Sequence, residues 1–260
     1  MLFELDNVAL EAAGRKVLGG LRFQIDAGER VVLLGVNGSG KTTLLKLLDG
    51  LMFPSQGTLR YSGQALDPPA LAQAAFRRRF RGEVALLFQN VDAMLFCPSV
   101  ADEIAFGPRQ LGLTDIEGRV AQWADTFGVA DLLDRPPFEL SGGEKKRVAL
   151  AALLSIDPRV LLLDEATAGL DPAWAGMLVN FLADHPSLTV LASTHNLTLA
   201  EELGSRALLL GRNGSGLLFD GPTAELLANQ ALLIESGLAH QHVHQHHGAP
   251  HAHFHVHDTE

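Results

Sequence analysis

A glycine-rich segment at residues 35–42, G-V-N-G-S-G-K-T, has the residue types and spacing of a polyphosphate site. Its glycines allow the backbone to curve with N–H groups pointing inward, and a helix behind it would add its positive N-terminal end. Lys41 would supply a charge for the β- and γ-phosphates, and the Thr42 hydroxyl suits Mg²⁺. The pattern has this meaning between a strand and a helix, and the apolar run V-V-L-L and an amphipathic stretch flank it. We expect ATP and Mg²⁺ here, held by Gly35, Asn37, Gly38, Ser39, Gly40, Lys41, Thr42 and Thr43.

A second apolar run, V-L-L-L at residues 160–163, leads directly into Asp164 and Glu165. Two solvated acids at the end of a strand would explain this pair equally well if it stood alone. Together with a phosphate loop, the pair predicts that Asp164 helps to hold Mg²⁺ and that Glu165 polarises the attacking water.

Gln89 and His195 also follow apolar segments that we expect to be strands. In an open parallel sheet, ligands gather beyond the carboxyl ends of the strands. Gln89 could therefore bind Mg²⁺ through its carbonyl and orient water through its amide, although alone it is equally well explained as a turn residue. A lone histidine is usually structural, but His195 belongs to the same expected edge of the sheet.

The segment L-S-G-G-E-K-K-R at residues 140–147 opens an apolar helix. Ser141 and Glu144 have the spacing of a capping box, so a well-capped helix start is the simpler explanation. Gly142 and Gly143 leave the N–H groups of that helix start bare, which favours a second anion site about 100 residues after the first.

The composition of the 260 residues describes an ordered protein, since 47% are hydrophobic and 19% charged. A net charge of −10 argues against a nucleic-acid partner, which needs clustered cations. The single cysteine, Cys97, cannot form an internal disulfide, which suits a reducing cytoplasm. The first residues read as a strand rather than a signal, and no apolar run approaches the ~18 residues of a membrane span. Work at a membrane would therefore require a partner.

The order of elements predicts an α/β fold of the P-loop NTPase type with a mostly parallel sheet. Short apolar runs between glycine turns in residues 2–34 predict an antiparallel β subdomain. Residues 98–140 read as an inserted helical subdomain, with a capping box at Thr114 and Glu117. We expect one ATPase domain over residues 1–238 and a flexible histidine-rich tail over 239–260.

Taken together, the phosphate loop, Gln89, the L-S-G-G segment, Asp164-Glu165, A-G-L-D at residues 168–171 and His195 resemble an ATP-binding cassette (ABC) ATPase. This resemblance extends from residue 2 to about residue 227. It implies two chains packed head to tail, with each ATP between the Lys41 loop of one chain and Ser141 and Gly143 of the other. It also implies that Glu165 is the general base, that His195 contacts the γ-phosphate, and that Gln89 senses both Mg²⁺ and a membrane partner.

A narrower resemblance is to the energy-coupling-factor importers, carried by E-I-A-F-G-P at residues 103–108, D-R-P-P at 134–137 and K-K-R-V-A at 145–149. Within that group the sequence is most similar to cobalt and nickel uptake ATPases. The resemblance implies a peripheral protein on the cytoplasmic side of the cell membrane. Its partners would be a second ATPase subunit of the same sequence, an integral membrane scaffold and a substrate-binding membrane subunit.

Three residues depart from the family pattern. Ala12 replaces an aromatic residue that often stacks on adenine, a contact typically worth ~1 kcal/mol. Weak base selectivity, or a contact from Arg15, would follow. Val91 stands where the group often has proline, and Glu144 where glutamine is commoner.

The composition changes after residue 238, where nine of the eleven histidines gather. They are His240, His242, His244, His246, His247, His251, His253, His255 and His257. Imidazole suits Ni, Co, Zn and Cu, so the tail predicts weak transition-metal binding. A purification tag is the simpler alternative, but the interruptions by other residues argue against engineering. With few apolar residues, we expect the tail to be disordered and to lack a structured metal site.

These features favour the ATP-hydrolysing subunit of a membrane importer for Ni²⁺ or Co²⁺. The alternatives are a soluble ABC ATPase in an assembly role, an importer ATPase for Zn²⁺ or a vitamin, and a metal-storage or sensory protein. Glu165 and the L-S-G-G segment argue against the last of these.

Overall fold

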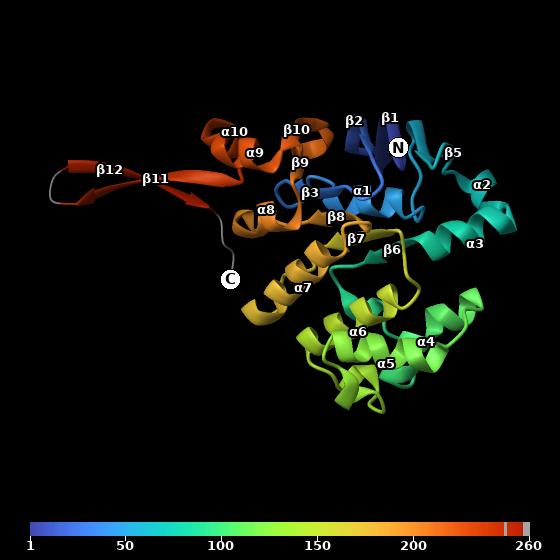
Figure 1. Ribbon diagram of the computed structural model, residues 1–260. Helices are drawn as coiled ribbons and strands as arrows, with labels where there is room; N and C mark the ends of the chain where they lie inside the picture. Colours follow the sequence, from blue (N-terminus) through green and yellow to red (C-terminus); the bar gives the residue numbers. More distant parts are fainter. Residues whose placement is uncertain (247–248, 257–260) are drawn as a thin grey trace. The chain divides into compact units, whose positions relative to one another are not determined.

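The computed structural model describes the backbone of residues 1–246 and 249–256 and the side chains of residues 1–239. The chain divides into two compact units. Unit 1 consists of Met1–Leu66 and Leu191–Glu260, and unit 2 of Asp67–Val190. Figure 1 labels most strands and helices of both units.

Unit 1 contains the predicted antiparallel sheet, in the strand order β2-β1-β4-β5. The strands are β1 (Phe3–Ala12), β2 (Arg15–Ile25), β4 (Gln56–Tyr61) and β5 (Gln64–Ala65). Phe3 lies opposite both Ile25 and Tyr61, and the Phe3 and Tyr61 rings are 5.0 Å apart. Apolar residues of β1 and β2 are buried, which makes this sheet a small core of its own.

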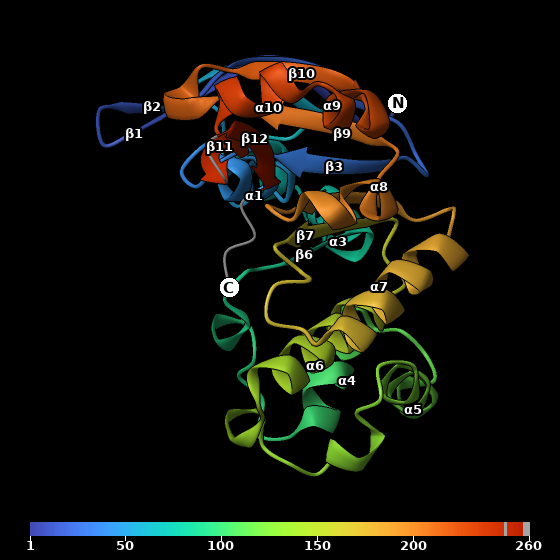
Figure 2. The same ribbon diagram turned by 90° about the vertical axis from the view of Figure 1, so that its left-hand side faces the viewer.

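Unit 1 also contains β3, the strand that leads to the phosphate loop, in a run of strands with the order β10-β9-β3-β8; the first two residues of β8 belong to unit 2. These strands are β3 (Arg30–Leu34), β8 (Thr189–Ser193), β9 (Arg206–Leu210) and β10 (Leu217–Pro222). β3 and β9 are parallel and lie side by side in Figure 2. Val31–Leu34 are completely buried, as expected for the interior of a parallel sheet. The helices of unit 1 are α1 (Lys41–Leu48), α8 (Ala200–Leu203), α9 (Thr223–Ala228) and α10 (Gln230–Ser236), with 3₁₀ turns η4 (Leu197–Leu199) and η5 (Arg212–Gly214).

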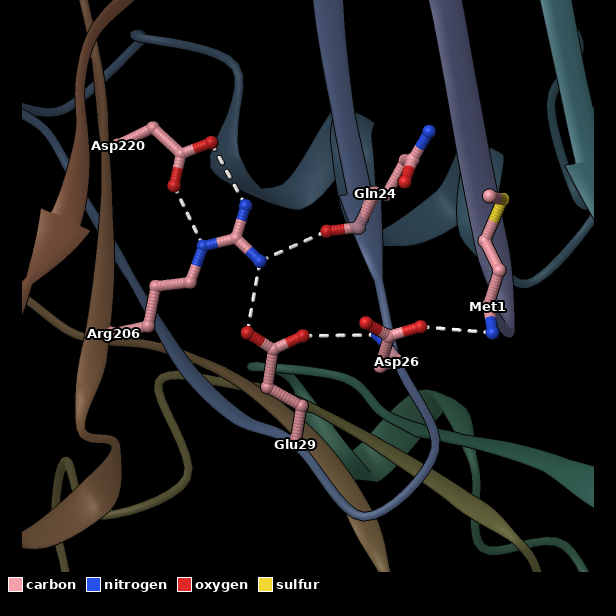
Figure 3. Close-up of polar contacts among 6 residues, drawn as sticks. All are labelled: Met1, Gln24, Asp26, Glu29, Arg206 and Asp220. Carbon is pink, nitrogen blue, oxygen red and sulfur yellow. Dashed lines mark hydrogen bonds and ion pairs between the residues drawn. The ribbon is translucent and has the colours of Figure 1, made fainter.

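An ion cluster around Arg206 joins β9, β10 and the β2–β3 turn in unit 1 (Figure 3). The Arg206 guanidinium donates to both Asp220 oxygens at 2.6 and 2.8 Å and to Glu29 Oε1 at 2.8 Å. It also donates to the Gln24 carbonyl, and Glu29 in turn accepts the Asp26 N–H. The bond to Asp220 and the neighbouring charges raise the pKa of Arg206. Two-pronged pairing of this kind fixes geometry as well as charge, so the cluster holds the start of β3 in place.

Unit 2 contains the parallel pair β6 (Val84–Leu87) and β7 (Val160–Asp164), with Leu87 opposite Leu163. Its helices are α2 (Pro68–Ala72), α3 (Ala74–Glu83), α4 (Val100–Leu111), α5 (Ile116–Thr126), α6 (Gly142–Leu154) and α7 (Pro172–Asp184). Three 3₁₀ turns complete it, at η1 (Val91–Ala93), η2 (Ala130–Leu132) and η3 (Pro137–Glu139). α4, α5 and α6 pack against one another (Figure 1). The predicted α/β fold, with its parallel and antiparallel sheets, is confirmed.

One local prediction in unit 2 is wrong. The capping box expected at Thr114 and Glu117 does not form, because Asp115 caps α5 with φ +52° and accepts the Gly118 N–H at 3.2 Å. Aspartate tolerates the left-handed region and places its carboxylate against the helix start, so it displaces Thr114 from that role.

The tail forms a β-hairpin that extends from the end of α10 (Figure 1). β11 (Ala239–His246) pairs antiparallel with β12 (Ala249–Val256). The sequence predicts a flexible tail here, and in the structure the backbone of these residues pairs as a hairpin. Three pairs of histidines lie directly opposite one another: His240–His255, His242–His253 and His244–His251. His247 and His257 lie outside the described residues.

Among the described residues, no helix has the length and apolar character needed to cross a bilayer.

Candidate functional site

The phosphate loop in unit 1 has a backbone that only glycine adopts readily. Gly35, Gly38 and Gly40 have φ values of +149°, +80° and +101°. A Cβ at Gly35 would lie 2.5 Å from the Ser39 hydroxyl, and one at Gly40 would lie 2.6 Å from Leu18. The loop therefore needs glycine both for its left-handed backbone and for the space around it. Gly40 also begins α1 without a side-chain cap, which leaves the N–H groups of the first turn to an outside acceptor.

Two side chains of this loop fit an anionic ligand. The Ser39 hydroxyl oxygen is buried and has no hydrogen-bond partner within the described part of the chain. The Lys41 ammonium is also buried, and it donates to the carbonyl oxygens of Gly35 at 2.7 Å and Val36 at 3.5 Å. A buried hydroxyl without a partner is costly, and a phosphate oxygen would satisfy it. The loop thus has a positive charge that would attract a phosphate. It also has a buried hydroxyl whose missing hydrogen-bond acceptor a phosphate oxygen would supply.

Thr42 and Thr43 are partly exposed in the first turn of α1, and Asn37 is exposed at the tip of the loop. The loop also borders a pocket of about 320 Å³ lined by Val36, Asn37, Gly38, Arg212 and Asn213. Arg212 and Asn213 follow β9 and were not identified from the sequence. Only the pairing of β9 beside β3 brings them to the loop.

His195 belongs to the same unit and lies at the same end of its sheet. It follows β8 and is partly exposed. The N–H of the preceding Thr194 donates to Leu33 O at 3.2 Å, so this segment lies next to the last residues of β3. The sheet of unit 1 therefore places His195 near the beginning of the phosphate loop.

Unit 2 brings Gln89, Asp164 and Glu165 to one edge of the β6–β7 pair. Leu87 and Leu163 are opposite one another, so the residues that follow them leave the sheet at the same end. Asp164 and Glu165 are buried, whereas Gln89 is exposed. Glu165 has φ +52°, a left-handed conformation that a residue with a Cβ rarely adopts. Backbone strain of this kind gathers at functional sites, where it aims a side chain.

The L-S-G-G segment forms the capped start of α6. The Ser141 hydroxyl accepts the Glu144 N–H, and Glu144 Oε2 accepts both the Ser141 N–H at 2.8 Å and its O–H at 2.7 Å. These bonds lower the pKa of Glu144, and the predicted capping box is confirmed. Gly142 and Gly143 are helical, and a Cβ on either would meet nothing within 4 Å. Their lack of side chains leaves the first-turn N–H groups exposed to any approaching anion.

The three cations after Glu144 have different partners. Lys145 pairs with Asp92 at 2.7 Å, and the Arg147 guanidinium lies 4.1 Å from the centre of the Trp174 ring. Lys146 is buried, and it donates to the Glu165 carbonyl at 3.2 Å and to the Ala168 carbonyl. Burial lowers the pKa of Lys146, while the Glu165 carboxylate opposes that shift. The burial of Lys146, the second cation of this run, was not predicted from the sequence.

The loop after Glu165 ends at α7, where Asp171-Pro172 has the sequence pattern of a capped helix start. Asp171 caps this helix and accepts the N–H groups of Ala173 and Trp174 at 3.0 and 3.1 Å. Pro172 occupies the first helical position, where its missing N–H costs nothing.

Residue 12, where related proteins often have an aromatic residue that stacks on adenine, is an alanine in β1. Ala12 lies opposite Arg15 at the end of the β1–β2 hairpin, and both are exposed. The turn between them uses the left-handed Ala13 and Gly14. Arg15 is therefore adjacent to Ala12, as a substitute contact would require.

A buried acid organises the segment before α4. Glu103 Oε2 accepts the N–H groups of Phe96 and Cys97 at 2.9 and 2.8 Å. Burial and the Glu103 charge together raise the pKa of Cys97 to about 11. The exposed rings of Phe96 and Phe106 stack edge to face nearby, with centres 4.9 Å apart.

Comparison with known proteins identifies a family model described as "ABC transporter", which matches residues 18–168, more than half of the chain. The nickel import ATP-binding protein NikO of Rhodobacter capsulatus is 45% identical over 243 residues. That match covers 91% of this chain and 95% of the relative.

Two solved structures share the fold. The structure of cbiO1 from Clostridium perfringens, part of the ABC transporter complex cbiONQ, has a TM-score of 0.75 and 28% identity. It covers 91% of this chain and 94% of its own. The dimeric, ADP- and Pi-bound post-hydrolysis state of the ATP-binding cassette MJ0796 has a TM-score of 0.77 and 21% identity, over 85% of this chain and 99% of its own.

Proposed function

This chain belongs to the ABC transporter family and is an ATPase, and from that premise we propose that residues 35–43 bind the ATP phosphates while Asp164 and Glu165 serve hydrolysis. The observation that carries this assignment is the phosphate loop, where the Ser39 hydroxyl has no hydrogen-bond partner among the described residues and α1 begins without a side-chain cap. Lys41 holds the β- and γ-phosphates, and the N–H groups of the first turn of α1 bind their oxygens.

We assign the Mg²⁺ ligands to Thr42, Gln89 and Asp164. A hydroxyl, an amide carbonyl and a carboxylate are the hard oxygen donors that Mg²⁺ prefers. When bound, Mg²⁺ neutralises charge on the phosphates during transfer. Asn37, Thr43 and the loop glycines complete the contacts to the nucleotide.

Glu165 is the proposed general base. Its carboxylate orients a water molecule and accepts a proton as the water oxygen attacks the γ-phosphorus. His195 would contact the γ-phosphate, a role supported by its position beside the end of β3. The left-handed backbone of the buried Glu165 supports its assignment, because such strain has a cost that a function can justify.

Hydrolysis in this proposal takes place in a dimer of two copies. The bare helix start at Ser141 and Gly143 is suited to an anion, and ATP held by the Lys41 loop of a second chain would supply one. MJ0796, a protein of the same fold, is itself dimeric in its ADP- and Pi-bound state.

The transported substrate is a divalent transition metal, Ni²⁺ or Co²⁺. This step is supported by 45% identity to a nickel import ATP-binding protein along nearly the whole chain, and by likeness to cbiO1 of a cbiONQ complex. The chain would sit on the cytoplasmic face of the cell membrane, bound to an integral scaffold and a substrate-binding membrane subunit.

The test is to co-express the chain with its membrane partners and measure ⁶³Ni and ⁵⁷Co uptake, with Glu165→Gln as the inactive control. ATP-dependent uptake of either metal supports the proposal. Uptake of Zn²⁺ alone, or of a vitamin alone, would show that the substrate is that compound and not Ni²⁺ or Co²⁺. Failure to co-purify with any membrane protein from detergent extracts would favour a soluble ATPase.

We also propose that the histidine-rich hairpin binds transition-metal ions through its opposed pairs. The backbones of these pairs are directly opposite in the antiparallel ladder, and imidazole is a ligand that Ni²⁺ and Co²⁺ accept.

Deleting Val243 tests this pairing, because it keeps all nine histidines but shifts the register of half of β11 against β12. Calorimetry with Ni²⁺ should show fewer or weaker sites than in wild type. Unchanged binding after the deletion would mean that composition alone binds the metal. Binding should fade below pH ~6.5, where imidazole protonates, and removal of residues 239–260 should leave ATP hydrolysis nearly unchanged.

A further inference from the structure

Lys146 is a buried cation within one helical turn of the Gly142–Gly143 pair. Its side chain and those of its neighbours on α6 belong to unit 2, and the residue is only 6% exposed. Lysine is almost never fully buried unless it is paired, because removing an ammonium group from water is costly. Its position therefore requires partners that compensate for that burial.

The partners of Lys146 are two carbonyl groups of the loop that contains the proposed general base. The ammonium donates to Glu165 O at 3.2 Å and to Ala168 O. The same Glu165 oxygen accepts the Ala168 N–H at 3.2 Å, which closes the turn 165–168. Lys146 thus binds both ends of one tight turn.

This contact bears directly on the conformation of Glu165. A left-handed backbone is unfavourable for glutamate, and here φ is +52°. A cation bound to the Glu165 carbonyl stabilises the peptide orientation that this conformation requires. The direction of the Glu165 Cα–Cβ bond follows from its backbone. By holding that backbone, Lys146 also sets the direction in which the carboxylate side chain leaves the loop.

We propose that Lys146 is a positioning residue for ATP hydrolysis, which links the start of α6 to the loop that aims Glu165. This inference rests on the proposed roles of Glu165 and of the α6 start. A phosphate bound at Ser141–Gly143 would then affect the position of Glu165 in the same chain, because Lys146 connects the start of α6 to the Glu165 carbonyl. Each chain of a dimer would couple the ATP held by its partner to its own hydrolysis.

Replacing Lys146 by methionine removes the ammonium and keeps an unbranched apolar chain. We expect kcat to fall by about tenfold or more, while KM and the Kd for MgATP change by less than about threefold, as for an interaction made in the transition state. Lys146→Arg, which keeps a donor and a charge, should recover part of kcat. A role in folding alone would lower the thermal midpoint and leave kcat per folded molecule unchanged.

A double substitution separates action through Glu165 from an independent effect. In a Glu165→Gln background, Lys146→Met should cause no further loss of the residual rate, because coupled residues are not additive. Full additivity of the two losses would overturn the proposal. If Lys146→Met does not fold, Lys146→Gln, which keeps one donor, takes its place in the same comparison.

Arg119→Met is the matched control. This substitution also removes a cation that donates to a backbone carbonyl, Ser155 O at 2.9 Å, but at the far end of α6. Its kcat should stay within about twofold of wild type, since no group in the reaction depends on it. A tenfold loss in both variants would show that α6 stability, not the Glu165 loop, is responsible. A wild type without ATPase activity would refute the proposed roles of the site, whereas equal rates in wild type and Lys146→Met would refute only this inference.

Discussion

The two glycine-bearing helix starts of this protein depend on glycine for different reasons. At the start of α1 the chain itself demands it, because Gly40 has φ +101° and no room for a Cβ beside Leu18. At the start of α6 the chain makes no such demand, since Gly142 and Gly143 are helical and open space surrounds them. Glycine in a helix costs roughly 0.5–1 kcal/mol relative to alanine, so α6 bears a cost that its own fold does not explain.

The difference indicates where each site is completed. The phosphate loop contains its own cation, its own uncapped helix and a buried hydroxyl in need of an acceptor. The α6 start is already capped by its own Ser141 and Glu144. A requirement for bare N–H groups there must come from a molecule outside the chain, which fits half of a site shared by two copies.

The largest expected effect comes from Glu165→Gln. By stopping turnover, this substitution allows ATP-dependent dimerisation through the α6 start to be measured without hydrolysis. The amide keeps the shape of the side chain but cannot accept a proton, so kcat should fall by about 10²–10⁴. Phosphate release measures the loss, and light scattering should show a dimer when MgATP is added. A variant with more than about a tenth of wild-type turnover would exclude Glu165 as the base.

The next largest effect should come from Gly40→Ala, which changes the phosphate loop at the start of α1. A left-handed alanine costs roughly 1–2 kcal/mol, and its Cβ would clash with Leu18 in addition. The Kd of the monomer for MgATP should rise about 10- to 100-fold in calorimetry. Wild-type affinity would show that the loop tolerates a Cβ and that its glycines are not required by the chain.

The same substitution at Gly143 should act in the opposite way on the monomer. Alanine is the better helix former, so the free energy of unfolding should rise by up to about 1 kcal/mol, with nucleotide binding by the monomer unchanged. ATP-dependent dimerisation in the Glu165→Gln background should weaken about tenfold or more, because a methyl group covers the N–H groups. Dimerisation that stays as strong as before would contradict a site shared through α6.

The smallest effect concerns the cap of α6 and its pH dependence. The Ser141 bonds lower the folded-state pKa of Glu144 from its ordinary value of 4.5. A depressed carboxyl pKa contributes stability above the unfolded value and loses it as the pH falls through the folded value. The thermal midpoint of wild type should therefore fall slightly more than that of Glu144→Gln on acidification from neutral pH to below pH 4.5. Parallel curves would show that the carboxylate adds nothing to the cap.

The sequence identified features that depend on neighbouring residues along the chain. The phosphate loop, the acids after V-L-L-L and the caps at Ser141 and Asp171 were all readable, because each is written within a few positions. Features that depend on distant packing were not. The burial of Lys146 depends on a loop some twenty residues further on, and Arg212 reaches the phosphate loop only because β9 pairs with β3. Asp115 replaced Thr114 as a cap because the two compete for one helix start, and the tail paired with itself although no apolar pattern required it.

The environment of Cys97 has a practical consequence for labelling. A thiol with a pKa of about 11 is almost wholly protonated at neutral pH, and the thiolate is the form that reacts with maleimides and oxidants. The native cysteine should thus remain silent during brief labelling at pH 7. A cysteine introduced at an exposed position would carry a fluorophore or spin label selectively, without first removing the only sulfhydryl in the sequence. Distances between two such labels, one on each copy, could follow the approach of the chains as ATP is bound and hydrolysed.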